Sequence, residues 1–136
     1  MYHEEIKQDD KILAIIVRSN FSAKDTYTFF TNDTDTQQLA YIHHPAGKII
    51  ESHIHNDVKR EIYKTTEVVF IKKGKLKTNF YTEEKKIICS HILGKGDVVL
   101  LLQGGHGFEV IEEVEMFVVK QGPYAGENDK IRFTTQ

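Results

Sequence analysis

The chain contains histidines and glutamates whose types and spacing suit the binding of a metal ion. His53 and His55 are two residues apart, so on a β-strand both imidazoles would point to the same side. Glu67 opens the apolar run that ends at Ile71, and His106 lies much later, in a glycine-rich stretch. Three imidazoles and one carboxylate are suitable ligands for a divalent first-row transition metal, provided that the fold brings them together.

The spacing around these residues resembles the two signature motifs of the cupin superfamily. In the first motif, a glycine is followed after five residues by His53 and His55, and six residues separate Glu67 from another glycine. The second motif resembles the stretch from Gly96 to His106. The resemblance covers roughly residues 40 to 120.

This resemblance implies a fold and a site. The fold would be all-β, a single cupin-type antiparallel barrel (a double-stranded β-helix, or jelly roll). His53, His55, Glu67 and His106 would bind a divalent ion, Mn, Fe, Ni or Zn, in the barrel interior. Glu61 lies closer to the histidine pair and is an alternative carboxylate ligand, although only Glu67 has the motif spacing to a glycine.

Other side chains could take part in chemistry beside such an ion. Glu51 has the same parity as the histidine pair and would be the candidate catalytic base, or would lie at the barrel rim. Lys59, Arg60, Lys130 and Arg132 could hold an anionic ligand, although scattered basic residues are usually solvated.

Composition limits the class of protein. The 136 residues predict one domain, 1–136, and a net charge of −2 argues against a nucleic-acid partner, which would need a basic face. No apolar run is long enough for a membrane-spanning helix, and the acidic N-terminus does not resemble a signal peptide. The single cysteine, Cys89, forms no intrachain disulfide, so we expect a cytoplasmic protein.

Apolar and β-branched runs separated by turn residues, without a helical period, predict a sheet protein. We expect N-terminal strands within 11–31, a surface loop over 56–65, and a tail over 122–136 that Ile131 and Phe133 anchor to the barrel. Gly74-Lys75 and Glu112-Glu113 are expected to be turns. The expected strands are 12–17, 26–31, 37–44, 48–55, 67–73, 76–81, 87–93, 98–102, 108–111 and 114–121.

The functional expectation follows from the metal site. A metal-dependent enzyme would act on a small oxygenated molecule such as a sugar derivative, as an isomerase, epimerase or oxygenase. The alternative is a non-catalytic cupin that binds or senses a small ligand, and a third hypothesis is a structural protein with a vestigial site. The resemblance also implies a homodimer.

Overall fold

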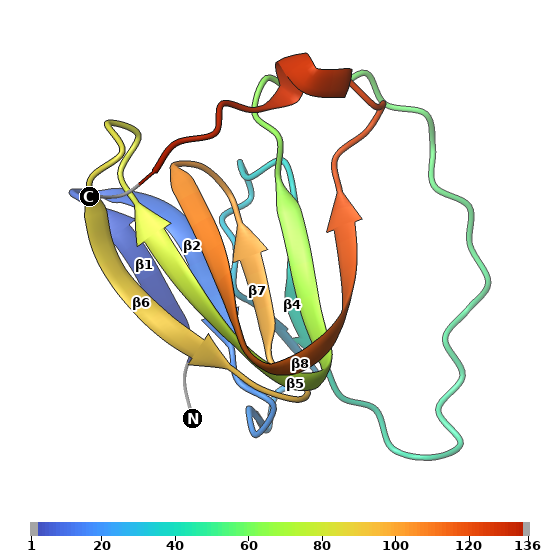
Figure 1. Cartoon of the computed structure of the whole chain (residues 1–136). Helices are drawn as coiled ribbons and strands as arrows, with labels where there is room; N and C mark the ends of the chain where they lie inside the picture. The colour runs from blue at the N-terminus through green and yellow to red at the C-terminus, as the bar shows by residue number, and fades with distance from the viewer. Residues whose placement is uncertain (1–2, 135–136) are drawn as a thin grey trace.

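The structure is a computed structural model that describes residues 3–134, and it is all-β as the sequence predicts (Figure 1). Within these described residues the one helical element is the short 3-10 helix η1 (Gly126–Asp129). The strands are β1 (Glu4–Gln8), β2 (Lys11–Val17), β3 (Tyr27–Phe29), β4 (Ala40–Ile42), β5 (Glu67–Tyr81), β6 (Ile87–Leu93), β7 (Val98–Leu101) and β8 (Gly105–Lys120).

Six strands form one antiparallel sheet in the order β1-β2-β7-β5-β6, with β8 paired to β5, and β3 and β4 form a second, two-stranded sheet. The first half of β5 lies between β7 and β8, and its second half lies between β6 and β8. Figure 1 shows β5 and β8 bending sharply together, so that the large sheet curls into a half-barrel. The half-barrel agrees with an all-β fold, and a closed barrel stays a prediction.

The bend corrects two of the expected turns. Gly74-Lys75 and Glu112-Glu113 are not hairpin turns, because β5 and β8 each run through them as one strand. Register shifts between Ile71 and Leu76 absorb the curvature. Gly74 has a φ of +90°, and a Cβ built there would lie 1.9 Å from the Glu113 carbonyl oxygen, so glycine allows the bend.

Two apolar clusters lie on opposite faces of the central strands. One fills the concave side of the half-barrel and includes Ile16, Val69 and Phe80. The other includes Ile15, Leu100 and Phe30, which lies beside the small sheet. The alternation of side chains along β2 and β7 supplies both clusters from the same strands. Residues before position 40 are therefore part of the core.

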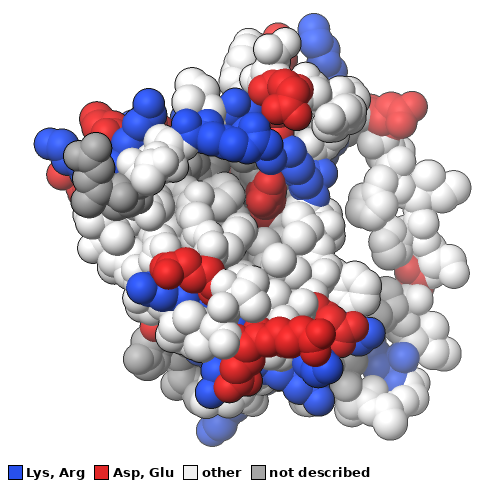
Figure 2. Space-filling model, viewed as in Figure 1, with Lys and Arg blue, Asp and Glu red and all other residues white. Residues whose placement is uncertain are grey.

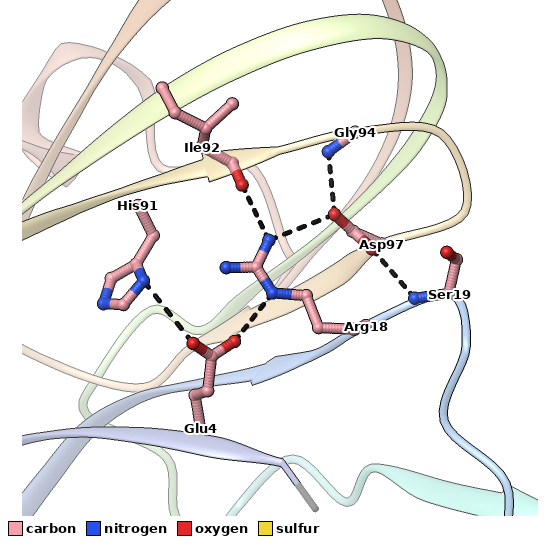
Figure 3. Close-up of polar contacts among 7 residues, drawn as sticks. All are labelled: Glu4, Arg18, Ser19, His91, Ile92, Gly94 and Asp97. Atoms are coloured by element: carbon pink, nitrogen blue, oxygen red, sulfur yellow. Dashed lines mark hydrogen bonds and ion pairs between the residues drawn. The ribbon is translucent and has the colours of Figure 1, made fainter. Parts of the chain in front are cut away.

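A network of polar groups joins the two ends of the curled sheet (Figure 3). Arg18, at the end of β2, donates hydrogen bonds from Nε to Glu4 Oε2 at 2.7 Å and from Nη1 to the Ile92 carbonyl oxygen at 2.6 Å. The same Nη1 lies 3.2 Å from Asp97 Oδ2, and Glu4 Oε1 lies 3.6 Å from His91 Nδ1. β1 and β6 are thus connected through side chains.

The long connection between β4 and β5, residues 43–66, is the main departure from the expected strands. It contains no strand, so the expected strand over 48–55 is wrong, while the expected surface loop over 56–65 is confirmed. The segment has apolar and polar residues in suitable alternation, but a strand also needs a partner edge, and the chain does not place one beside it. In Figure 1 this connection is an extended loop that lies away from the two sheets.

No helix among the described residues is long and apolar enough to cross a membrane.

Candidate functional site

Glu67 and His106 are the two expected ligands that the fold brings together. Glu67 is the first residue of β5, and His106 pairs with Phe80 near the other end of that strand. Glu67 has the same parity as buried Val69, and His106 lies opposite buried Phe80, so both side chains are on the concave side of the sheet. Glu67 Oε2 lies 3.7 Å from His106 Nε2.

The electrostatic setting favours an ionised carboxylate at this position. The adjacent His106 imidazole is the largest influence and lowers the pKa of Glu67, and the positive charges of Lys120 and Lys130 lower it further. Partial burial of the carboxylate opposes this shift without overcoming it. Glu67 is therefore a charged, partly buried acceptor next to an imidazole nitrogen.

Glu67 and His106 line a cavity of about 1020 Å³. Its walls come from the ends of β5 and β8, the glycine-rich turn before β8, and the C-terminal tail. Phe108 contributes an aromatic wall, and its ring centroid lies 5.6 Å from that of His106. The volume is ample for a ligand of the size of a monosaccharide.

Basic side chains line the same cavity. Figure 2 shows lysine and arginine side chains gathered in a band beside the hollowed face of the molecule. The lysines and arginine among the lining residues are Lys64, Lys85, Lys130 and Arg132. Of the basic residues singled out from sequence, Lys130 and Arg132 are at the cavity, whereas Lys59 and Arg60 lie on the exposed 43–66 connection.

Lys64 and Lys85 were missed, and their immediate sequence gives little signal. Lys85 lies in the turn between β5 and β6 with a positive φ of 69°. Its position at the cavity results from the curl of β5, which a local pattern does not encode.

The tail closes one side of the cavity. The Phe133 ring packs edge-on against Tyr81 with 5.0 Å between ring centroids, as expected for an anchor. Ile131 does not have this role, because its side chain is exposed. Asp129 in η1 accepts a hydrogen bond from Thr65 Oγ1 and pairs with Lys120, which connects the helix to the segment before β5 and to the end of β8.

The structure places His53 and His55 apart from this cavity. Their rings contact each other with centroids 5.2 Å apart, and His53 Nδ1 lies 2.9 Å from the Glu51 carbonyl oxygen. Both side chains are exposed on the extended connection, and neither lines the cavity. The expected ligands thus form two pairs, His53 with His55 and Glu67 with His106, which the single chain does not join.

The remaining carboxylate candidates lie with the histidine pair. Glu51 and Glu61 are exposed on the same connection and do not line the cavity. Glu61 Oε2 accepts a hydrogen bond from the Tyr63 hydroxyl at 3.4 Å. Among residues 3–134, no three or more His, Cys, Asp or Glu side chains form a group that could hold a metal ion.

Comparisons with family models, with curated proteins and with solved structures find no match to this chain.

Proposed function

We propose that this protein binds a divalent transition-metal ion at Glu67 and His106 and holds a small, oxygen-rich anion beside it in the cavity. The observation that carries the proposal is the approach of Glu67 Oε2 to His106 Nε2 at 3.7 Å inside a cavity with four basic residues in its wall. A sugar acid or a related hydroxy acid has the matching chemistry, with a carboxylate for the basic residues and hydroxyl oxygens for the metal.

The residues fit such an ion in part. A carboxylate and an imidazole on one concave face are the donor types that Mn, Fe, Ni and Zn accept, and an ion between two donor atoms 3.7 Å apart is sterically reasonable. Two protein ligands alone hold an ion weakly, and the cupin resemblance supplies His53 and His55 as the other two. In one chain those histidines lie outside the cavity.

An ion at this position would polarise a substrate oxygen as a Lewis acid. The protein's own residues would do the remaining work. Lys130 and Arg132 would orient the anionic group, and Phe108 would exclude water from one side of the ligand. Isomerisation, epimerisation or oxygenation of the bound molecule is the reaction class that the proposal implies.

A non-catalytic binding or sensing function is the second candidate, and one observation favours it. Glu51, the residue expected to act as a base, is exposed on the 43–66 connection and is not in the cavity wall. Ligand binding by metal-loaded protein, with unchanged ligand recovered afterwards, would support this second function.

Calorimetric titration with Mn²⁺ and Zn²⁺ tests the metal site. Glu67→Gln and His106→Ala should each weaken binding at least tenfold, because each removes one of the ligands. Glu109→Gln is the matched control, since Glu109 lies on the other face of β8 with Asn79 and Lys77 and should leave binding unchanged. Equal affinity in all variants would contradict the proposed site.

A panel of sugar acids and the corresponding neutral sugars tests the ligand class. The acids should bind metal-loaded protein more tightly than the neutral sugars, and Arg132→Gln should reduce that preference. Lys24→Gln should not, because Lys24 is exposed and lies outside both the cavity and the 43–66 connection. Equal binding of acids and neutral sugars would contradict the proposal that the ligand is an anion.

A further inference from the structure

β8 has a long edge that pairs with no other strand among residues 3–134. β8 is 16 residues long and pairs with β5 on one side only. Over 116–119 both faces of the strand carry exposed apolar side chains, with Val118 51% and Phe117 61% exposed. A long edge with unpaired backbone groups and bare apolar faces is a site for pairing with another strand.

The second unpartnered feature is the arm, which we define as residues 49–63. It is extended and free of regular structure, and all its large apolar side chains except that of Ile62 are exposed, Ile54 to 91%. Its hydrogen bonds join the arm to itself, from His53 to Glu51 and from Tyr63 to Glu61. No hydrogen bond or ion pair links it to the rest of residues 3–134.

The alternation of the arm fits the two faces of β8. In an extended strand, His53 and His55 would share one face, while Ile50, Ile54 and Val58 would share the other. On β8, His106 lies on the concave face, and Phe117, which pairs with exposed Phe70, lies on the opposite face. One strand pairing along 116–119 could therefore put the histidines on the concave face, the face of Glu67 and His106, and cover the opposite apolar face at the same time.

The direction of the arm favours a second copy of the chain as the source of that strand. In Figure 1 the arm runs the same way as the second half of β8. Pairing there within one chain would be parallel, whereas all strand pairs of the fold are antiparallel. A copy related by a two-fold axis perpendicular to β8 presents its arm in the reverse direction, so that the pairing is antiparallel.

The position of the arm agrees with this assignment. Figure 2 shows open space between the arm and the body of the molecule, so the arm does not lie on its own sheet. The 43–66 connection that contains it is anchored at both ends, because His43 N donates a hydrogen bond to the Thr26 carbonyl oxygen and Thr66 is buried. The residues between those ends are presented outward, as an exchanged segment would be.

We propose that two copies of this chain exchange their arms, and that each arm pairs with the β8 edge of the other copy and brings His53 and His55 to the partner's cavity. Each complete site would then contain Glu67 and His106 from one copy and the histidine pair from the other. The metal at this composite site rests on the proposed function, whereas the exchange of arms does not. The dimer is thus required for a complete site.

Light scattering on the full chain tests the exchange without any metal. The wild-type protein should have the mass of a dimer, and Ile50→Asp/Ile54→Asp should raise the dimer dissociation constant at least tenfold, because the charges would lie on the covered face. Ile87→Asp is the matched control, since Ile87 is also apolar and exposed but lies on β6, outside the arm and outside the cavity wall. Circular dichroism of both variants checks that the sheet still folds. A wild-type monomer, or a dimer that the arm variant does not weaken, would overturn the proposal.

Subunit complementation tests the composite site, with Co²⁺ absorption and metal stoichiometry as readouts. His53→Ala/His55→Ala and Glu67→Gln/His106→Ala should each lose tight binding alone. Coexpressed with different tags and purified as a mixed dimer, they should recover one complete site per dimer, about half the wild-type capacity. Recovery requires ligands from different chains, because every chain in the mixture lacks one pair.

The outcomes separate the two proposals. A wild-type protein that binds one metal per chain while the mixed dimer recovers none would overturn the exchange and leave the proposed function intact. A dimer that depends on the arm but binds no Mn²⁺, Zn²⁺ or Co²⁺ would overturn the proposed function and leave the exchange intact.

Discussion

Arg18 shows how single side chains hold the curled sheet together. Its guanidinium bonds to Glu4 on β1, to the Ile92 carbonyl oxygen on β6, and to Asp97 in the turn before β7 (Figure 3). Asp97 also accepts hydrogen bonds from the backbone N–H groups of Ser19 and Gly94. The partly buried carboxylates are thus satisfied by donors from several elements, as buried charges must be.

Replacing this guanidinium should destabilise the protein clearly. We expect Arg18→Met to lower the free energy of unfolding by about 2–3 kcal/mol, because charge-assisted hydrogen bonds are lost and the acceptors are left partly buried. Lys73→Met, which breaks an exposed ion pair with Glu113, should cost less than about 0.5 kcal/mol. Urea unfolding of both variants makes the comparison, and equal losses would show that the network is not stabilising.

Asp129 gives a pH dependence with a definite sign. The hydrogen bonds from Lys120 and Thr65 lower the pKa of Asp129 below its ordinary value. A carboxyl group with a lowered folded-state pKa stabilises the fold above its unfolded pKa, and this stabilisation is lost as the pH falls through the folded-state pKa. The melting temperature of wild-type protein should therefore exceed that of Asp129→Asn at pH 6, with the gap closing below about pH 3.8. A gap that is constant from pH 6 to pH 2 would contradict this assignment.

At the residue scale, the sequence predicted the two site residues that come together. Glu67 and His106 were identified from their spacing, and the structure places them on one concave face. The basic residues of the cavity wall were predicted only in part, because Lys64 and Lys85 are brought to it by the three-dimensional fold and not by a local pattern. That His53 and His55 bind the same ion as Glu67 and His106 stays a prediction.

At the scale of elements, β5 and β8 determine the shape of the molecule. They pair along nearly their whole length, from Glu67 opposite Lys120 to Tyr81 opposite Gly105. The sequence predicted two strands on either side of Gly74, since Gly-Lys between apolar runs is typical of a tight turn. In the structure β5 continues through Gly74 and bends there together with β8. Only the pairing of β5 with β8, which is distant in sequence, distinguishes a bent strand from a tight turn.

The same long-range dependence explains the other differences between expectation and structure. β6 (Ile87–Leu93) was predicted with its observed bounds because its apolar run ends in clear turns. β1 was missed because Ile6 is its only strongly apolar residue, and the strand exists through its pairing with β2. The segment 48–55 was predicted as a strand from its alternation, which does not say where a partner strand lies.

Gly74→Ala tests the role of the bend. The new methyl group would meet the Glu113 carbonyl oxygen at a backbone φ of +90°, so we expect a loss of more than about 2 kcal/mol in the free energy of unfolding. Gly47→Ala is a matched control, because Gly47 has a φ of +87° but no atom within 4 Å of the added methyl. It should cost only the backbone strain, about 1 kcal/mol. If the two losses are equal, the close contact with β8 is not what requires glycine at position 74.

At the scale of the whole molecule, the fold has a filled core on one part of the sheet and bare apolar surface on another. Phe80, Leu93 and Val99 are fully buried, while Val110 and Val119 on β8 are about 60% exposed. Burying large apolar side chains is worth roughly 1.5–3 kcal/mol each, so a partner that covered β8 would gain substantially. The proposed exchange of arms accounts for this surface, for the exposed arm and for the separated ligand pairs with one rearrangement.

The most direct test of the proposed function is the anomalous diffraction signal of crystals grown with Mn²⁺. We expect a peak within bonding distance of Glu67 Oε2 and His106 Nε2, with His53 and His55 of a second copy beside it. The peak should disappear in Glu67→Gln/His106→Ala. Crystals that show Mn²⁺ elsewhere, or show none next to Glu67 and His106 when Mn²⁺ exceeds the protein severalfold, would contradict the proposed metal site.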